Sequence, residues 1–132
     1  MKKEIEPGLK FTVEGEVTEK NTALAIGSGN LRVLATPYMA AMMENAAYRS
    51  IWPCLDDTDS SVGTRLELTH SAATPVGMKL RIESEVTAVD GRRITFDIKA
   101  YDEAGLIGEC IHERVIVNEQ KFMTRTYDKL GK

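Results

Sequence analysis

Residues 36–53 read TPYMAAMMENAAYRSIWP, and this stretch has the period of an α-helix. Its apolar and small residues recur at spacings of three and four, which places them on one helical face: Met39, Met42, Met43, Ala46, Ala47 and Ser50. Pro37 suits the first helical position, and Pro53 should end the helix because proline has no amide hydrogen to donate. The sequence therefore predicts one long helix with a single apolar face.

Segments of alternating polarity follow this helix. Apolar and polar residues take turns over 62–72, 80–88, 94–100 and 106–118, and also over 9–18 ahead of the helix. Asp90-Gly91 is a strong hairpin signal between two of these segments, and Asp102 to Gly105 forms a second turn. Alternation of this kind is typical of antiparallel strands with one buried face. We expect a meander of long strands.

Two stretches have no clear period. Residues 21–34 contain Gly27-Ser28-Gly29-Asn30, which favours a turn or a mobile loop. Residues 56–61 read DDTDSS, which favours a solvated loop between the helix and the first long strand. We expect neither stretch to form regular structure.

One helix and a run of antiparallel strands make an α+β protein. The sheet must bury its apolar face against the helix, and a curved sheet wrapped around one central helix satisfies this requirement. A cystatin-like or related α+β roll would satisfy it too. At 132 residues the chain has the length of one domain, and we expect that domain to cover residues 1–132.

The composition is that of a globular protein, with 42% hydrophobic and 28% charged residues. A formal net charge of −3 provides no basic field to attract nucleic acid. No stretch approaches the roughly 20 apolar residues of a membrane span. We expect neither nucleic acid nor a membrane as a partner.

The first residues and the cysteines bear on the cellular compartment. Residues 1–7 read MKKEIEP, with charges where a signal peptide would carry an apolar run. Cys54 and Cys110 are the two cysteines, and a lone pair in a chain with no export signal favours reduced thiols over a disulfide. We therefore expect a cytoplasmic location.

Metal and cofactor motifs are missing from the sequence. The two histidines and two cysteines stand apart, without the paired spacing of metal ligands. Gly27-Ser28-Gly29 lacks the third glycine of a dinucleotide-binding loop, and no phosphate-binding loop or nucleophile elbow occurs. The residues that remain as candidates for chemistry are Thr36, Glu44 and His70.

Glu44 lies in the predicted helix beside its apolar face. The residues three and four positions away are Ala40, Ala41, Ala47 and Tyr48, so no cation within the helix pairs with it. One interpretation is an exposed glutamate that simply favours helix. The other is a carboxylate at the edge of a pocket floored by alanines, where it can act as a base.

His70 and Thr36 also allow two interpretations each. His70 has the strand parity of Leu66 and Leu68, so its imidazole should point inward, either as a structural group or as the acid–base partner of Glu44. Thr36 can cap the helix with its hydroxyl, or it can join a site at the helix start, where free N–H groups suit a developing oxyanion. His112 and the two cysteines show no activating neighbour in the sequence, and we interpret them as structural.

Several short motifs around these residues have a familiar joint spacing. They are Ala35-Thr36-Pro37-Tyr38-Met39, Met43-Glu44, Val62-Gly63-Thr64, the run THSAATPVG over 69–77, Ile107-Gly108 and His112-Glu113-Arg114. With this set the chain, from about Leu34 to Phe122, resembles the fluoroacetyl-CoA thioesterase family of hotdog proteins. The combined spacing of threonine, glutamate and histidine is far more specific than any one of them.

The resemblance implies a hotdog fold and the hydrolysis of an acyl-CoA. It implies that Thr36, Glu44 and His70 are the catalytic residues and that Gly63 and Arg114 lie near the substrate. Family members are dimers with active sites at the subunit interface, so it also implies a homodimer or a higher assembly. It implies no metal or redox cofactor, with coenzyme A present only as part of the substrate.

The segment before Thr36 departs from the family pattern. The fluoroacetyl-specific enzyme has an aromatic-rich lid there, whereas residues 27–32 read GSGNLR, with no aromatic residue. We therefore expect a hydrolase of short or medium acyl-CoA esters, in which Glu44 is either the nucleophile or the base that activates water. A hotdog enoyl-CoA hydratase or dehydratase and a catalytically silent acyl-CoA-binding module remain as alternatives.

Overall fold

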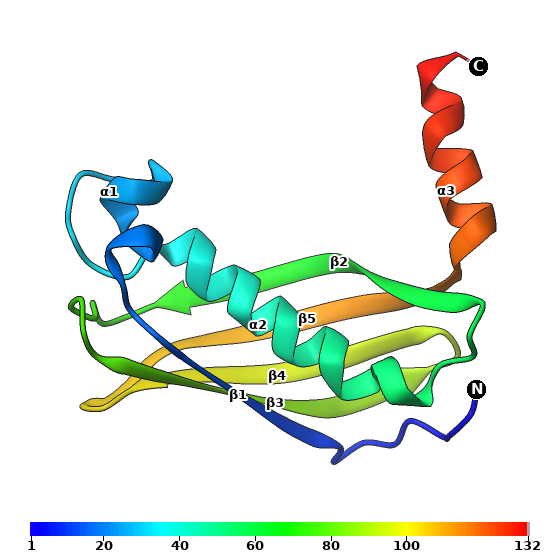
Figure 1. Ribbon diagram of the computed structural model, residues 1–132. Coiled ribbons are helices and arrows are strands. Elements are labelled where there is room, and N and C mark those ends of the chain that lie inside the picture. The colour runs from blue at the N-terminus through cyan, green and yellow to red at the C-terminus, as the bar shows by residue number, and fades with distance from the viewer. Residues whose placement is uncertain (132) are drawn as a thin grey trace.

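A computed structural model describes residues 1–131 as a five-stranded antiparallel sheet with one long helix lying across it (Figure 1). The strands are β1 (Lys10–Glu16), β2 (Asp59–His70), β3 (Lys79–Asp90), β4 (Arg93–Asp102) and β5 (Gly105–Asn118), in the spatial order β1-β3-β4-β5-β2. The long helix is α2 (Thr36–Ile51). The predicted α+β fold, with an antiparallel sheet around a central helix, is confirmed.

The helix buries the face that its sequence period predicts. Its fully or largely buried residues are Met39, Met43, Ala46, Ala47, Ser50 and Ile51, and Met42 packs at the edge of the same core. Across from them the sheet contributes Phe96, Ile82 and Ile98, each with no exposed surface. The α-helix ends at Ile51, and the 3₁₀ turn η2 (Trp52–Cys54) contains Pro53, as the missing amide of proline requires.

The predicted turns also form. β3 and β4 make a hairpin through Gly91 and Arg92, and Gly91 has a φ of +60°, a conformation that glycine adopts without strain. Between β4 and β5, the Asp102 carboxylate accepts hydrogen bonds from the backbone amides of Ala104 and Gly105, at 2.8 and 3.1 Å. The meander β3-β4-β5 therefore follows the sequence closely.

Residues 21–34 are more regular than we expected. They include the end of the 3₁₀ turn η1 (Glu19–Asn21) and the short helix α1 (Ala23–Ile26). Thr22 caps α1 by accepting a hydrogen bond from the amide of Ala25 at 3.1 Å. Leu34, only 2% exposed, anchors the other end of the segment through a β-bridge to Thr22. The prediction of a turn or loop is confirmed for residues 27–32, which contain no helix or strand, and was wrong for residues 21–26, where it overlooked the Thr22 cap.

The solvated loop predicted over 56–61 is shorter than expected. β2 begins at Asp59, and Asp59 and Ser61 are buried. The Asp59 carboxylate lies 3.2 Å from the Arg92 guanidinium, which compensates its burial. The polar start of β2 can therefore lie in the sheet, because the Arg92 guanidinium of the β3–β4 turn pairs with the buried Asp59 carboxylate.

A β-bulge in β2 changes which residues face the helix. The register with β5 shifts between Gly63 and Arg65, so one extra residue enters the strand. Ser61 and Gly63 therefore point toward the helix side together with Leu66, Leu68 and His70. The predicted parity was correct from Leu66 onward and wrong for Val62 and Thr64.

A third α-helix, α3 (Glu119–Tyr127), follows β5 and projects away from the sheet (Figure 1). The sequence interpretation ended with the strand at Asn118 and did not include it. The Asn118 side chain caps this helix by accepting from the amide of Lys121 at 3.0 Å. The 3₁₀ turn η3 (Asp128–Leu130) follows it. No residue of α3 is buried.

Two further findings concern the cysteines and the length of the helices. Cys54 and Cys110 are both buried and unpaired, as predicted for reduced thiols. Within residues 1–131 no helix has both the length and the apolar character needed to cross a membrane.

Candidate active site

One line of α2 side chains runs along strand β2. Thr36, Ala40, Glu44 and Tyr48 are four residues apart, and this spacing stacks them on one side of a helix. Contacts locate both ends of the line: Thr36 bonds to His70, and Tyr48 lies beside Arg114, whose guanidinium carbon is 5.9 Å from the ring centre. Among the described strands β2 is an edge, paired only with β5. The line of side chains thus borders an unpaired sheet edge.

The Thr36–His70 pair forms the first part of the candidate site. Thr36 Oγ1 lies 2.7 Å from His70 Nδ1, within hydrogen-bonding distance. The other ring nitrogen, Nε2, is buried and has no hydrogen-bond partner in the described chain. Burial lowers the pKa of His70 below its ordinary value of 6.5, while a hydrogen bond with the Ala72 backbone opposes that shift. The imidazole is therefore neutral at pH 7, with one nitrogen unpartnered.

Thr36 does not cap the helix, so that interpretation was wrong. The helix begins at Thr36 itself, Pro37 occupies the second position, and the N-cap is Ala35, which has no side-chain oxygen. The Thr36 hydroxyl is directed instead to His70, 34 residues away in sequence. A partner this distant cannot be inferred from local sequence signals.

A hollow of about 280 Å³ adjoins the Thr36–His70 pair. Its walls come from three segments, and the lining residues are Ala23, Ser28, Val33, Leu34, Thr36, His70, Ser71, Ala72 and Ala73. Most of these side chains are small, and no phenylalanine, tyrosine or tryptophan is among them. The segment before α2 therefore forms one wall of this hollow.

Glu44 lies over Gly63 in the second part of the site. A Cβ atom placed on Gly63 would be 2.9 Å from Glu44 Oε2 and 3.1 Å from His112 Cε1. Both distances are shorter than ordinary van der Waals contact, so a side chain at position 63 would displace the carboxylate or the ring. Glycine at this bulge allows the Glu44 carboxylate to approach the strand backbone closely.

Arg114 is a buried cation next to this carboxylate. The residue is 7% exposed. Its guanidinium donates to Ser61 Oγ at 2.9 Å and to the Ser61 carbonyl at 3.1 Å, and it lies 3.2 Å from His112 Nε2. Burial lowers the Arg114 pKa and the charge of Glu44 opposes this, but a guanidinium stays protonated. No carboxylate among the described residues lies within 4.0 Å of it, so its charge has only neutral hydrogen-bond partners.

His112 holds Arg114 in place. The ring has no exposed surface, stacks on Phe96 at 5.8 Å, and has Nδ1 2.7 Å from the Arg65 carbonyl. With the proton on Nδ1, the Nε2 lone pair accepts from Arg114. Burial lowers the His112 pKa, and the nearby Arg114 charge lowers it further, whereas the Arg65 carbonyl and Glu44 raise it. The sequence interpretation assigned no site role to His112, although its two-residue spacing from Arg114 on one strand placed both on the same face.

The structure does not bring all three predicted residues together within one chain. Thr36 and His70 form one pair, and Glu44 joins Gly63 and Arg114 in a second cluster. Thr36 and Glu44 are eight positions apart in the helix, which corresponds to about 12 Å along its axis. No hydrogen bond links Glu44 to either member of the pair in residues 1–131.

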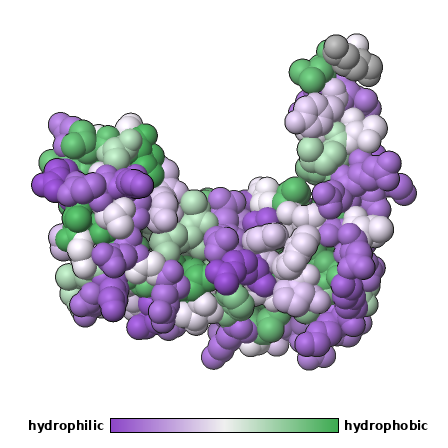
Figure 2. Space-filling view, in the orientation of Figure 1, coloured by the Kyte–Doolittle hydropathy of each residue, from purple (hydrophilic) through white to green (hydrophobic). Residues whose placement is uncertain are grey.

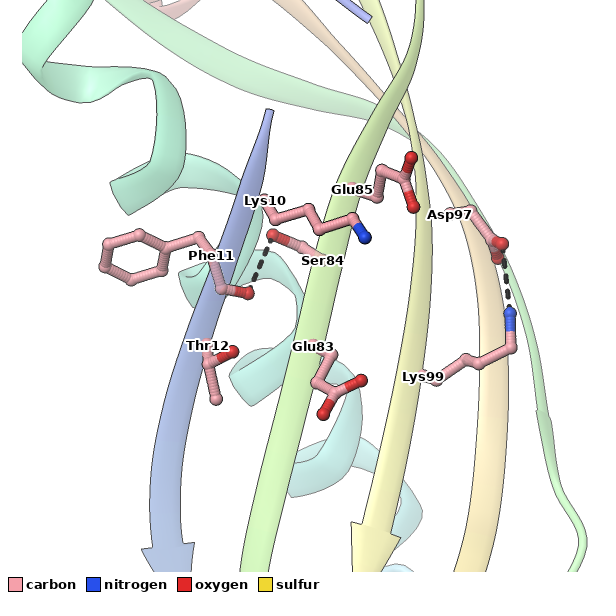
Figure 3. Close-up of a pocket in the computed structure, with 8 residues that line it drawn as sticks. All are labelled: Lys10, Phe11, Thr12, Glu83, Ser84, Glu85, Asp97 and Lys99. Atoms are coloured by element: carbon pink, nitrogen blue, oxygen red, sulfur yellow. Dashed lines mark hydrogen bonds and ion pairs between the residues drawn. The ribbon is translucent and has the colours of Figure 1, made fainter. Parts of the chain in front are cut away.

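A different hollow, on the face of the sheet turned away from α2, has no comparable chemistry (Figure 3). Its charged residues are Lys10, Glu83, Glu85, Asp97 and Lys99, and the Lys99 ammonium is 3.0 Å from the Asp97 carboxylate. Imidazole and thiol groups do not line it. We interpret this surface as solvated charge on the outside of the sheet.

Comparison with solved structures defines the class of protein. The structure superposes on that of the fluoroacetyl-CoA thioesterase FlK with a TM-score of 0.91, at 30% identity over 96% of this chain and 98% of the other. A Thermus thermophilus thioesterase superfamily member matches with a TM-score of 0.88, at 29% identity over 97% and 94% of the two chains. The protein is a hotdog-fold thioesterase.

Sequence comparison identifies the family. Residues 17–120 match the family described as fluoroacetyl-CoA-specific thioesterase. The fluoroacetyl-CoA thioesterase of Streptantibioticus cattleyicolor is 36% identical over 97 residues, which are 74% of this chain and 70% of that protein. The chain belongs to the fluoroacetyl-CoA-specific thioesterase family, as the resemblance of its motifs predicted.

Proposed function

We propose that the protein hydrolyses acyl-CoA thioesters, with Thr36, Glu44 and His70 as catalytic residues and Gly63 and Arg114 beside the reacting group. The observation that carries this proposal is the 2.7 Å contact of Thr36 with His70 at the edge of a hollow, with His70 Nε2 buried and unpartnered. A solved relative described as a complex with fluoroacetate and CoA, at 31% identity over 89% of this chain, supports the substrate class.

A homodimer would complete the site. In a twofold dimer formed by antiparallel pairing of β2 with the partner's β2, the Asp59 end of one strand lies beside the His70 end of the other. The Glu44–Gly63–Arg114 cluster of one subunit would then approach the Thr36–His70 pair of its partner. The unpaired edge of β2 and the separation of the two clusters support this arrangement.

The reaction adds water across the C–S bond. In one route Glu44 attacks the acyl carbon and expels the CoA thiolate, and water then hydrolyses the resulting acyl-Glu44 anhydride; in the other, Glu44 takes a proton from the water that attacks the acyl carbon. In both routes the charge that develops on the carbonyl oxygen is stabilised by the nearby Arg114 guanidinium. When Thr36 donates to His70 Nδ1, the Nε2–H group can donate a hydrogen bond to the departing sulfur, and the proton released by water, held by Glu44, passes to the thiolate to form the thiol. The products are a carboxylic acid and free coenzyme A. This mechanism uses side chains and water, with no metal or redox cofactor.

Subunit mixing tests the shared site. A Glu44→Gln subunit and a His70→Ala subunit should each be nearly inactive alone. Mixed dimers should regain activity, because one of their two sites then carries both wild-type residues. If each site takes both residues from one chain, mixing will restore nothing. Light scattering on the same samples shows whether a dimer is present at all.

We also propose that the acyl group is not restricted to fluoroacetate. The hollow beside His70 has small lining residues, and the segment 27–32 has no aromatic side chain to fill it. A thiol-release screen should show hydrolysis of acetyl-, propionyl- and longer acyl-CoA esters. The kcat/KM for fluoroacetyl-CoA should exceed that for acetyl-CoA by no more than about tenfold, or ~1.4 kcal/mol. A ratio of several thousand would contradict this proposal, and hydration of enoyl-CoA without thiol release would contradict the reaction.

The two buried, unpaired cysteines support a reducing compartment, and we propose that the protein works in the cytoplasm.

A further inference from the structure

Two segments extend beyond the free edge of β2 and give the molecule the outline of a U (Figures 1 and 2). We call residues 19–34, which contain α1, the α1 arm, and residues 119–130, which contain α3, the α3 arm. The α1 arm leads to Thr36 and so stands at the His70 end of β2. The α3 arm follows Asn118, which pairs with Asp59 at the other end of β2. The free strand edge lies between the arms.

Both arms expose large apolar side chains. Of the twelve such side chains exposed in the described residues, three belong to the α1 arm and four to the α3 arm: Leu24, Ile26 and Leu31, then Phe122, Met123, Tyr127 and Leu130. The largest exposures are those of Leu31 in one arm and Leu130 in the other, both 66%. Exposed apolar residues gathered in this way mark interaction surfaces in soluble proteins.

The α3 arm has one apolar side and little support from its own chain. Met123, Tyr127 and Leu130 are spaced by four and three residues, which aligns them along one side of a continuing helical turn. The arm is joined to the sheet through its first turn, where the amide of Glu119 donates to the Thr58 carbonyl at 2.9 Å. A nine-residue helix is marginal in water by itself, so a second surface is needed to stabilise it.

Antiparallel pairing of β2 with the β2 of a second copy places the α1 arm of that copy beside α3. A twofold axis perpendicular to the sheet exchanges the two ends of the strand, so the Asp59 end of one copy faces the His70 end of the other. Each α3 arm, which extends past the edge at the Asp59 end, then meets the partner's α1 arm, which extends past the edge at the His70 end. The same operation creates two such contacts, and together they cover both apolar surfaces.

We propose that the α3 arm of each subunit packs Met123, Tyr127 and Leu130 against the α1 arm of a second copy, around Leu24 and Leu31. This inference rests on the homodimer proposed above. The α1 arm forms a wall of the hollow beside Thr36 and His70, through Ala23, Ser28 and Val33. The α3 arm of one subunit therefore supports the α1 arm of the other, which is a wall of that other subunit's hollow. The α3 arm does not line the hollow, but its contact orders the α1 arm.

Hydrogen exchange at two protein concentrations tests the contact in the wild type. When dilution dissociates the dimer, the amides of 23–27, 119–127 and β2 should lose protection together. The variant Tyr127→Glu should raise exchange at 23–27 and increase the dimer dissociation constant by about tenfold, since a carboxylate would be buried against leucines. Thr124→Glu is the matched control: it adds the same charge to α3 outside the apolar stripe and should change neither quantity.

A reciprocal variant makes the test independent of the stability of α3. Leu24→Glu should expose the partner's α3 to exchange, although the substitution is in the other arm. A wild-type dimer in which Leu24→Glu and Tyr127→Glu leave the opposite arm's protection unchanged would overturn this contact while the β2 dimer stands. A wild-type monomer would overturn the dimer itself. Protection of the arms only upon addition of phosphatidylcholine vesicles would assign them to a membrane surface instead and overturn the proposal.

Discussion

The two clusters of the candidate site are built in opposite ways. Thr36 and His70 are neutral and meet at the edge of an open hollow, with one imidazole nitrogen left without a partner. Around Glu44, the cation of Arg114 is buried and its hydrogen bonds go to Ser61 and His112. The first cluster is suited to relaying a proton, because one imidazole nitrogen bonds to the Thr36 hydroxyl and the other is free to bond to the reacting group. The second is suited to stabilising negative charge, because its charge is permanent and its position is restrained.

The largest effect should come from removing the titratable groups of both clusters. Glu44→Gln and His70→Ala should each lower kcat by roughly 10² or more, since a positioned acid or base contributes this much. Melting temperatures should remain close to wild type, because neither side chain fills the core. Glu14→Gln, an exposed carboxylate on β1 at the opposite edge of the sheet, is the control and should retain full activity. Activity within a few-fold of wild type in both site variants would contradict their assignment.

Loss of the restraint on Arg114 should have the next largest effect. His112→Phe preserves the ring that stacks on Phe96 but removes the acceptor of the Arg114 bond and the contact with the Arg65 carbonyl. We expect kcat to fall by roughly tenfold, and the free energy of unfolding to fall by about 1–3 kcal/mol because buried polar groups lose their partners. His112→Gln, whose amide oxygen can accept from Arg114, should recover part of the lost kcat. Equal kcat in the two variants would show that the bond to Arg114 has no catalytic consequence.

Gly63→Ala tests the close approach of Glu44 to the strand. The new methyl group would lie 2.9 Å from Glu44 Oε2, so the flexible carboxylate must move. We expect kcat to fall several-fold, with a small change in melting temperature, because the carboxylate can turn aside more easily than the strand can. Thr64→Ala at the same bulge is the control, since Thr64 is exposed. A variant that unfolds but keeps its kcat per folded molecule would indicate a purely structural glycine.

The smallest effect concerns pH. Burial lowers the pKa of both His70 and His112 from the ordinary 6.5, so the folded state binds these protons less readily than the unfolded state. Well above pH 6.5 both histidines are neutral in the folded and the unfolded state, so they do not change the free energy of unfolding. As the pH falls below 6.5 toward the folded-state pKa values, the unfolded state binds more protons and the free energy of unfolding decreases. Thermal unfolding of the wild type and of His112→Phe between about pH 5 and 8 checks this. The variant should lose less stability on acidification, and an equal loss in both proteins would contradict the assignment to His112.

The central parts of the fold could be predicted because they repeat a local period. The long helix α2 and the strands β3, β4 and β5 each bury one side against the same core, so apolar residues recur at helical or alternating spacing. The α1 and α3 helices could not be found in this way. They are short and largely exposed, and their first turns are defined by single capping side chains, Thr22 and Asn118.

The candidate site was predictable by residue type more than by arrangement. A helical carboxylate and an inward-facing histidine follow from spacing, and the combined motifs led to the correct family. The bulge after Gly63 could not be anticipated, because a one-residue insertion in a pairing depends on both strands. The roles of Ser61 and His112 were missed for the same reason, since Arg114 and Ser61 are 53 residues apart in the chain.

By itself, the sequence determined the long helix, the meander, the hairpin turns and the family, because each of these is encoded in neighbouring residues or in a fixed order of motifs. Only the tertiary structure decided that Thr36 bonds to His70 rather than capping its helix, that Glu44 approaches Gly63, and that Arg114 is held by neutral groups. These contacts join residues that are far apart in sequence, and their geometry depends on how the helix is seated on the sheet. The division of the site into two clusters follows from the rise of about 1.5 Å per helical residue between Thr36 and Glu44.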